Sequence, residues 1–244
     1  MGGYSPPGGS KAVTLRLALR LAPLAQAGRS PRSAVGSPFY GLPDRAAVRG
    51  LRTAANVLPC EGMHPWHDCY VDDTIVESAF PVVIEVPKGS KNKYELDKET
   101  GLLRLDRVLY SAVHYPADYG FIPRTFCDDG DPLDALVISQ EPVHPLTLVE
   151  ARAIGVMRMR DEKGIDDKIV AVSVRDPAFA EYTDKGQIPG HTLREIRRFF
   201  EDYKTLEHKQ VIVEDLLGVE DAIRIIRESL DLYRQLRRGE LRRV

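Results

Sequence analysis

The sequence predicts a mainly β protein of the α+β class, in which a small β-barrel is flanked by two helices. Three observations predict this fold. Short runs of β-forming residues, separated by turns, occupy the chain from Phe80 to about residue 174. Two segments with helical periodicity follow them, and the first 62 residues carry neither pattern in sustained form. Strands that precede a group of helices are typical of a barrel or sheet with helices packed outside it.

The predicted strands are rich in Val, Ile, Leu and Tyr and are bounded by turn residues. They occupy residues 82–86, 94–96, 102–109, 136–138, 149–159 and 169–174. The sequence Lys-Glu-Thr-Gly at 98–101 lies between two of these runs and predicts a hairpin turn.

Two helices are predicted after the strands. Thr192 and Glu195 have the spacing of a capping box, which predicts that the first helix begins at Thr192. Its apolar residues recur at helical intervals and are Leu193, Ile196, Phe200 and Tyr203. The second helix is predicted over about 220–236, with Gly239 past its end. Its apolar stripe comprises Ala222, Ile226, Leu230 and Tyr233.

The chain divides by composition into a basic leader, residues 1–62, and a folded domain, residues 63–244. The leader carries eight Lys and Arg residues against Asp44 and Glu61, a net charge of +6, so the remainder carries −8 of the total of −2. Arg16 and Arg20 lie four apart in a Ser- and Ala-rich segment, which is typical of an organellar transit peptide. A disordered tail or a wrongly chosen start remains the alternative. We expect a cytoplasmic protein, or a mitochondrial or plastid one if the leader is a transit peptide.

Composition also excludes several classes of function. An acidic domain argues against binding to nucleic acid, which needs a basic face. Arg16 and Arg20 interrupt the leucine-rich stretch, so no segment has the roughly 20 apolar residues of a membrane span. The cysteines are Cys60, Cys69 and Cys127; their odd number and spacing predict neither a disulfide framework nor a zinc site.

The segment Asp-Asp-Gly-Asp-Pro-Leu-Asp at 128–134 is the most informative motif. Gly130 and Pro132 favour a tight bend that brings the carboxylates of Asp129, Asp131 and Asp134 together. Converging carboxylates repel each other unless a cation neutralises them, and hard oxygen ligands select Mg²⁺, Mn²⁺ or Ca²⁺. A solvated acidic turn is the structural alternative.

Two further clusters support a site for a metal and a phosphate. The turn at 159–168 is expected to project Asp161, Glu162 and Asp166 from a hairpin tip. Cations and phenols that can bind phosphate oxygens lie elsewhere in the domain. They are Lys88, Lys91, Lys93, Arg107, Tyr115, Tyr119, Tyr203 and Lys204. Each could instead be a solvated lysine or a core tyrosine.

The run Asp129 to Ala135 resembles the signature of the soluble family I inorganic pyrophosphatases. The resemblance extends from about residue 82 to about 233 and includes the sequences at 83–87, 93–97, 106–107, 115–120 and 199–204. It implies a five-stranded OB-like barrel, with Asp131 as the catalytic base. The implied metal ligands are Asp129, Asp134, Asp161 and Asp166. The implied phosphate contacts are Lys93, Arg107, Tyr119, Lys168, Tyr203 and Lys204. Glu85, Glu95, Tyr115 and Glu162 would complete the pocket.

The same resemblance implies hydrolysis of inorganic pyrophosphate to two orthophosphates by metal-activated water, with no phosphoenzyme intermediate. The expected cofactor is Mg²⁺, several ions per site, with Mn²⁺ possible. The compact domain is similar to the bacterial and plant type, so a homo-oligomer, a hexamer, is expected, with no nucleic acid or membrane partner. A phosphotransferase with an aspartyl nucleophile needs an alternating α/β chain, which this β-rich sequence lacks. A non-catalytic, metal-binding OB-like module remains the alternative.

Overall fold

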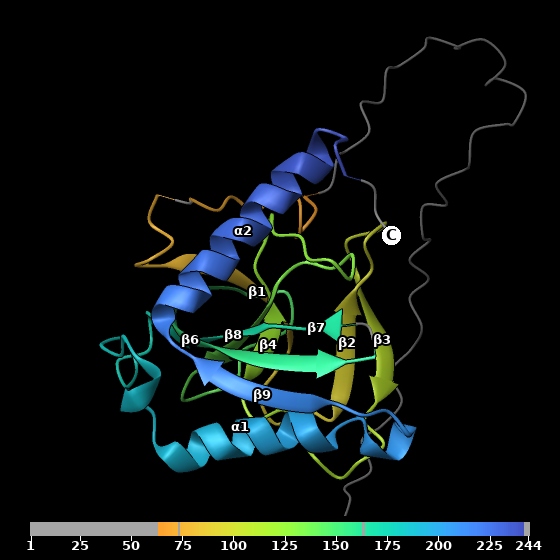
Figure 1. Ribbon diagram of the computed structural model, residues 1–244, viewed down its shortest axis with the longest axis vertical. Helices are drawn as coiled ribbons and strands as arrows, with labels where there is room; N and C mark the ends of the chain where they lie inside the picture. The colour runs from red at the N-terminus through yellow and green to blue at the C-terminus, as the bar shows by residue number, and fades with distance from the viewer. Residues whose placement is uncertain (1–62, 73, 163, 242–244) are drawn as a thin grey trace, which may run out of the picture. The chain divides into compact units, whose positions relative to one another are not determined.

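The computed structural model describes residues 63–72, 74–162 and 164–241, and these form a mainly β fold with two helices (Figure 1). The strands are β1 (Phe80–Val86), β2 (Asn92–Leu96), β3 (Leu103–Val108), β4 (Asp118–Phe121), β5 (Asp134–Ile138), β6 (Leu148–Asp161), β7 (Gly164–Ile165), β8 (Lys168–Ser173) and β9 (Ile212–Leu217). The helices are α1 (Gly190–Asp202) and α2 (Val219–Arg237), with short 3₁₀ turns at Lys185–Gln187 and Thr205–Glu207.

Five strands close into a barrel. They pair in the order β1-β4-β5-β8-β6, and β1 pairs with β6 to complete the ring. The β5–β8 pair is parallel, whereas the other four pairs of the ring are antiparallel. β7 and β9 extend the sheet along β6. The prediction of a five-stranded, OB-like barrel with two helices is therefore confirmed.

A second, two-stranded sheet, β2–β3, lies beside the barrel (Figure 1). Its turn is the predicted one. Gly101 adopts φ 71°, a left-handed conformation that favours glycine, and the Asp97 carboxylate accepts hydrogen bonds from the backbone N–H groups of Glu99 and Thr100. These local contacts fix the hairpin at the edge of the cavity described below.

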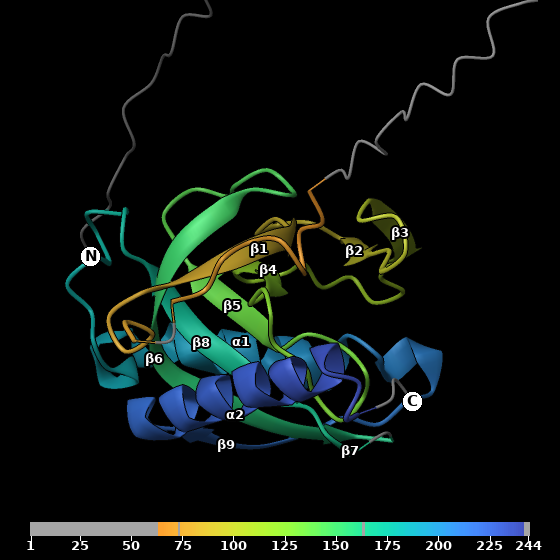
Figure 2. The same ribbon diagram turned by 90° about the horizontal axis from the view of Figure 1, so that it is seen from above.

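The two helices cover different parts of the barrel. α2 contacts β6, and its buried residues, among them Ala222, Ile226 and Leu230, form one hydrophobic core with residues of the barrel strands. α1 lies along β9 on the other side of the sheet (Figures 1 and 2). Its Phe199 and Phe200 pack with aromatic residues of the β3–β4 connection and of β4, so α1 supports the site from behind.

The structure corrects one prediction about the helices. α1 begins at Gly190 with Pro189 as N-cap, and no side chain caps it. Thr192 and Glu195 therefore lie inside the helix, and the predicted capping box is wrong. Pro189 has no N–H of its own and a restricted φ, so it sets the helix start without a side-chain acceptor. The second helix agrees with its prediction, and Gly239 past its end has φ 74°.

Three strands were not predicted: β4, β9 and the two-residue β7, which lies in the predicted turn at 159–168. β4 contains Asp118 and Gly120, residue types that are depleted in strands, and β9 contains Glu214 and Asp215. Both segments are strands because of their partners in the sheet, which the local sequence does not reveal. Among the residues that the structure describes, no helix is long and apolar enough to cross a membrane.

Candidate active site

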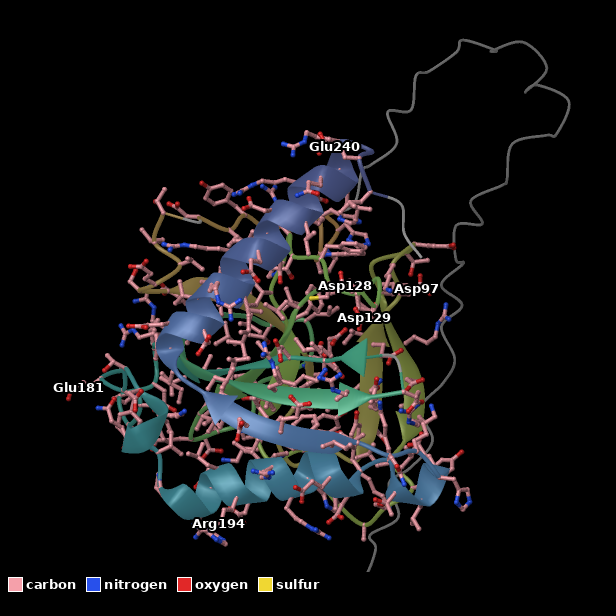
Figure 3. The ribbon with its side chains drawn as sticks, viewed as in Figure 1. Asp97, Asp128, Asp129, Glu181, Arg194 and Glu240 are labelled. Atoms are coloured by element: carbon pink, nitrogen blue, oxygen red, sulfur yellow. The ribbon has the colours of Figure 1, made fainter. Side chains whose placement is uncertain are left out.

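One polar cavity of about 320 Å³ collects the predicted site residues, with the exception of Tyr115 and of the candidate phosphate-binding lysines Lys88 and Lys91. The cavity lies between the barrel, the β2–β3 hairpin and the end of α1. Figure 3 shows Asp129 on the side that faces this hairpin. The predicted residues that line it are Glu85, Lys93, Glu95, Arg107, Tyr119, Asp129, Asp131, Asp134, Asp161, Glu162, Asp166, Lys168, Tyr203 and Lys204. Segments from residue 85 to residue 204 thus meet at one place.

The acidic loop before β5 is held by its own backbone. Gly130 has φ 85°, and its N–H donates to the Cys127 carbonyl at 3.0 Å. The Cys127 N–H donates to the Asp131 carbonyl at 2.9 Å, and the Asp129 carboxylate accepts from the Asp131 N–H at 3.1 Å. The bend that Gly130 and Pro132 predict is therefore present, and it directs Asp129, Asp131 and Asp134 to the same cavity.

Asp134 and Lys168 begin the parallel strands β5 and β8 as register partners. The buried Lys168 ammonium contacts the carboxylates of both Asp134 and Asp166. Tyr119 of β4 donates its hydroxyl to Asp134 at 2.5 Å. Burial lowers the pKa of Lys168, but Asp134 and Asp166 raise it more, so the net shift is well above the usual value. Lys168 is therefore a permanent cation between two candidate metal ligands.

The second acidic loop contacts the lysines that follow α1. Lys204 donates to Asp161 at 3.0 Å, and the Asp161 side chain is only 7% exposed. Lys209 lies 3.6 Å from Glu162 at the rim. Burial also lowers the pKa of Lys204, and Tyr203 and Asp161 reverse that effect. The segment after α1 thus supplies positive charge to the carboxylates of the hairpin tip.

The β2–β3 hairpin supplies the opposite wall. Lys93 contacts Glu95 and lies 3.4 Å from Asp106. Arg107 lies 2.9 Å from Asp106, and its Nε lies 3.0 Å from a Glu207 oxygen. Those two atoms are buried but not aligned as a hydrogen bond, so the contact is ionic only. Two acids, Asp106 and Glu207, therefore hold the Arg107 guanidinium at the cavity wall.

Two carboxylates of the cavity have no cationic side-chain partner among the described residues. Glu85 accepts the Leu96 N–H at 2.7 Å, and burial followed by the charge of Asp134 raises its pKa to about 8. Asp129 lies at the mouth, open to solvent on one side, and partial burial raises its pKa. Both shifts are caused first by burial and then by neighbouring carboxylates, so a cation bound beside these two groups would stabilise their charged forms.

This donor set fits a hard divalent cation, because carboxylate oxygens are its preferred ligands. Within the described ranges, however, no three His, Cys, Asp or Glu side chains are arranged so that they could hold a metal ion together. In this arrangement each of the following aspartates contacts a lysine: Lys168 contacts both Asp134 and Asp166, Lys204 contacts Asp161, and Lys98 contacts Asp131. The residue types fit the ion, while lysines neutralise the acids in this arrangement.

Tyr115 lies behind the cavity wall rather than on it. Its ring is 2% exposed and packs 5.4 Å from Tyr119 and 4.7 Å from Phe199. Two cavity lysines, Lys98 and Lys209, were not predicted. Lys98 was interpreted as a turn residue, and its place directly after the 93–97 motif was the available signal. Lys209 lies in a loop with no pattern.

The barrel is small and closed, and one of its cavities combines carboxylates with lysine, arginine and tyrosine side chains. This combination is typical of proteins that act on phosphates with the help of a metal ion. The family model described as inorganic pyrophosphatase matches residues 82–234. A soluble inorganic pyrophosphatase of Chlamydomonas reinhardtii is 52% identical over 172 residues, 70% of this chain and 89% of that protein. One of Arabidopsis thaliana is 54% identical over 180 residues, 74% and 84% of the two chains.

The solved structures agree. The crystal structure of the Thermus thermophilus inorganic pyrophosphatase has a TM-score of 0.65 and 42% sequence identity, and the match covers 68% of this chain and 97% of that one. The chain belongs to the inorganic pyrophosphatase family. The alternative of a non-catalytic OB-like module has no support among these relatives, which are named as enzymes.

Proposed function

We propose that this protein hydrolyses inorganic pyrophosphate to two orthophosphates, without a phosphoenzyme intermediate. The observation that carries the proposal is the single cavity in which Asp131 and the aspartates around it face Lys93, Arg107 and Lys204. Pyrophosphate is a polyanion, so a site that hydrolyses it must supply positive charge and a proton acceptor together. This cavity contains both.

Each group has a role that follows from its place. We assign proton acceptance to Asp131, because in the loop before β5 its side chain is 42% exposed and contacts Lys98, whereas that of Asp134 is 24% exposed and held by Lys168. Arg107, Lys93 and Lys204 are assigned to the phosphate oxygens, with Tyr203 beside them. Tyr119 donates its one hydroxyl hydrogen to Asp134, so it can donate to phosphate only if Asp134 releases it, whereas Lys168 contacts Asp134 and Asp166 and keeps a third N–H.

The metal site is assigned to Asp129, Asp134, Asp161 and Asp166, with Glu85, Glu95 and Glu162 around them. We propose Mg²⁺ as the resident ion, several per site, with Mn²⁺ as a substitute. Bound there, the ion supplies positive charge against the phosphate oxygens and lowers the pKa of a water molecule. The raised pKa values of Glu85 and Asp129 support this assignment, since both groups would be stabilised as anions by a cation.

The experiment is phosphate release from purified protein, with pyrophosphate and with ATP, over a range of Mg²⁺ concentrations. We expect Mg²⁺-dependent release from pyrophosphate that is far faster than release from ATP and that a chelator abolishes. Asp131→Ala is the matched inactive control. Equal rates on both substrates, or no release from pyrophosphate at saturating Mg²⁺, would reject the proposal.

We also propose a homo-oligomer, a hexamer as in the bacterial and plant type that the sequence resembles. An apolar surface that a second copy can cover lies on β3 and next to its ends. It is formed by the exposed side chains of Leu102, Leu105, Val108 and Tyr110. The mass in solution, measured by light scattering, checks this.

For location, we propose the cytoplasm, or an organelle if residues 1–62 are a transit peptide. Fluorescent fusions with and without those residues distinguish the two.

A further inference from the structure

Two neighbouring aspartates precede Lys168, and only one of them faces the cavity. Asp166 lines the cavity and contacts Lys168. Asp167 does not line it and instead makes a two-pronged ion pair with Arg158 of β6. Arg158 Nε donates to one Asp167 oxygen at 3.0 Å, and Nη2 donates to the other at 2.9 Å. The Asp167 side chain is 10% exposed and that of Arg158 29%, so water reaches this pair mainly from the arginine side.

The strand register decides which of the two aspartates lies on the face of the sheet that lines the cavity. β6 pairs with the segment after the tip at Asp161↔Gly164, Arg160↔Ile165 and Met157↔Lys168. The same register sets Met159 opposite Asp166, whose N–H donates to the Met159 carbonyl at 2.9 Å, and Arg158 opposite Asp167. Opposed residues share a face of the sheet. Asp166 and Lys168 therefore lie on the same face of the sheet as the buried Met157 and Met159, and Asp167 lies on the opposite face.

The apolar pattern does not specify this register. All residues of β8, from Lys168 to Ser173, are buried, so both faces of the strand are covered. A strand that is buried on both faces lacks the alternation of apolar and polar residues by which a half-buried strand fixes its register. The ladder itself already contains two registers, because Ala153 pairs with Ala171 whereas Gly155 pairs with Val170 across a bulge. A shift of that bulge along the ladder would turn Asp166 and Lys168 outwards and Asp167 inwards.

We propose that Arg158 and Asp167 are a positioning pair that fixes the register of the β6–β8 hairpin, so that Asp166 rather than Asp167 enters the active site. The pair acts through Asp166 and Lys168 and touches neither substrate nor metal. The effect on catalysis rests on the proposed function, whereas the effect on register does not.

The test compares Arg158→Met, Asp167→Asn and the double variant with a matched pair, Arg160→Met and Glu214→Gln. Arg160 lies on the same strand and pairs with Glu214 of β9 at 3.0 Å, and neither residue lines the cavity. Misplaced catalytic groups lose about tenfold to a hundredfold in rate, so we expect a fall of that size in kcat for both single variants. The double variant should lose no more than a single one, since the two residues act as a unit. The control variants should stay within about twofold of the wild type.

A second readout does not depend on activity. In metal-free protein, amide hydrogen exchange over residues 159–168 should become faster in Arg158→Met and Asp167→Asn and should stay unchanged in Arg160→Met. The exchanged pair, Arg158→Asp with Asp167→Arg, should restore both exchange and kcat. If Arg158→Met does not fold, the nearly isosteric Asp167→Asn decides. The proposal is overturned if a folded Asp167→Asn variant exchanges its amide hydrogens over residues 159–168 at the wild-type rate. It is also overturned if the control variants change that rate as much. An inactive wild type would reject the proposed function while leaving the exchange test intact.

Discussion

Asp131 and Asp134 lie three residues apart in one motif but have different contacts. Asp131 is open and contacts Lys98, whereas Asp134 contacts Tyr119 and Lys168. We expect Asp134→Asn to weaken metal binding, because an amide keeps an oxygen ligand but loses the charge, so added Mg²⁺ recovers part of the rate. Asp131→Asn should lose about a hundredfold or more in kcat, since a general base is worth that much, and the loss should persist at saturating Mg²⁺.

The measurement is the initial rate over a grid of pH and Mg²⁺ concentration. The deficit of Asp131→Asn should become smaller at high pH, where the attacking water needs less help from a base. If Mg²⁺ restores both variants to the same extent, with no change in pH dependence, Asp131 is a ligand and the base lies elsewhere, at Asp161 or Glu162.

Glu85 makes stability depend on pH. Its pKa in the folded protein is about 8, above the usual value of 4.5. Between these two pH values the carboxyl group is protonated in the folded state and ionised in the unfolded state. Stability from this group is fully present below pH 4.5 and is lost as the pH rises through about 8. Glu85→Gln keeps an oxygen to accept the Leu96 N–H and does not titrate. We expect the metal-free variant to be more stable than the wild type at pH 8 to 9, by on the order of a few kcal/mol.

Urea unfolding of both proteins at pH 5 and at pH 9, with a chelator present, checks this. Glu95→Gln is the matched control, because Glu95 is more than half exposed. The explanation is wrong if the difference between Glu85→Gln and the wild type is the same at both pH values.

At the scale of the elements, the close approach of β1 and β4 depends on one glycine. A Cβ on Gly120 would lie 1.9 Å from the Val83 carbonyl oxygen and 2.8 Å from the Ile84 Cα, both backbone atoms that cannot move aside. We expect Gly120→Ala to cost more than about 3 kcal/mol of stability, because the barrel must open between two of its strands. Thermal unfolding measures this. Gly218→Ala, where a Cβ meets no atom within 4 Å, is the control and should unfold close to the wild type. A melting temperature for Gly120→Ala near that of the control would show that β1 can shift.

The elements also show what the sequence can predict. Long periodic segments such as β6 and α2 were predicted to within two residues, because their own apolar pattern determines them. β4 was missed because Gly120 is there for its close contact with β1, not for strand propensity. The site residues were predicted through motifs, but their contacts were not. That Lys168 holds two aspartates depends on the parallel β5–β8 pair, which links residues 34 positions apart.

At the scale of the whole molecule, the cavity needs only residues from Glu85 to Lys209. Residues 1–62, the predicted leader, lie outside the described residues. We expect protein that starts at Met63 to keep the turnover and melting temperature of the full chain, since the leader carries none of the site motifs. Protein that starts at Phe80 is the contrast, because it loses the fully buried Trp66, whose Nε1 donates to the Thr125 carbonyl at 2.8 Å. A large loss in the Met63 form would mean that the leader contributes to the folded domain.

The wide spacing of the site residues along the chain has a consequence for biosynthesis. The cavity wall includes Glu85 from the first strand of the barrel and Lys204 from the turn after α1, and α2 follows both. A chain that leaves the ribosome from its N-terminus can form the β2–β3 hairpin early, but it carries an incomplete set of charges until most of its length has been translated. During that time Asp131 already has Lys98, but Asp134 lacks Lys168 and Asp161 lacks Lys204. The nascent chain therefore carries only part of the positive charge of the cavity, and it gains the ability to act on a phosphate only near the end of its synthesis.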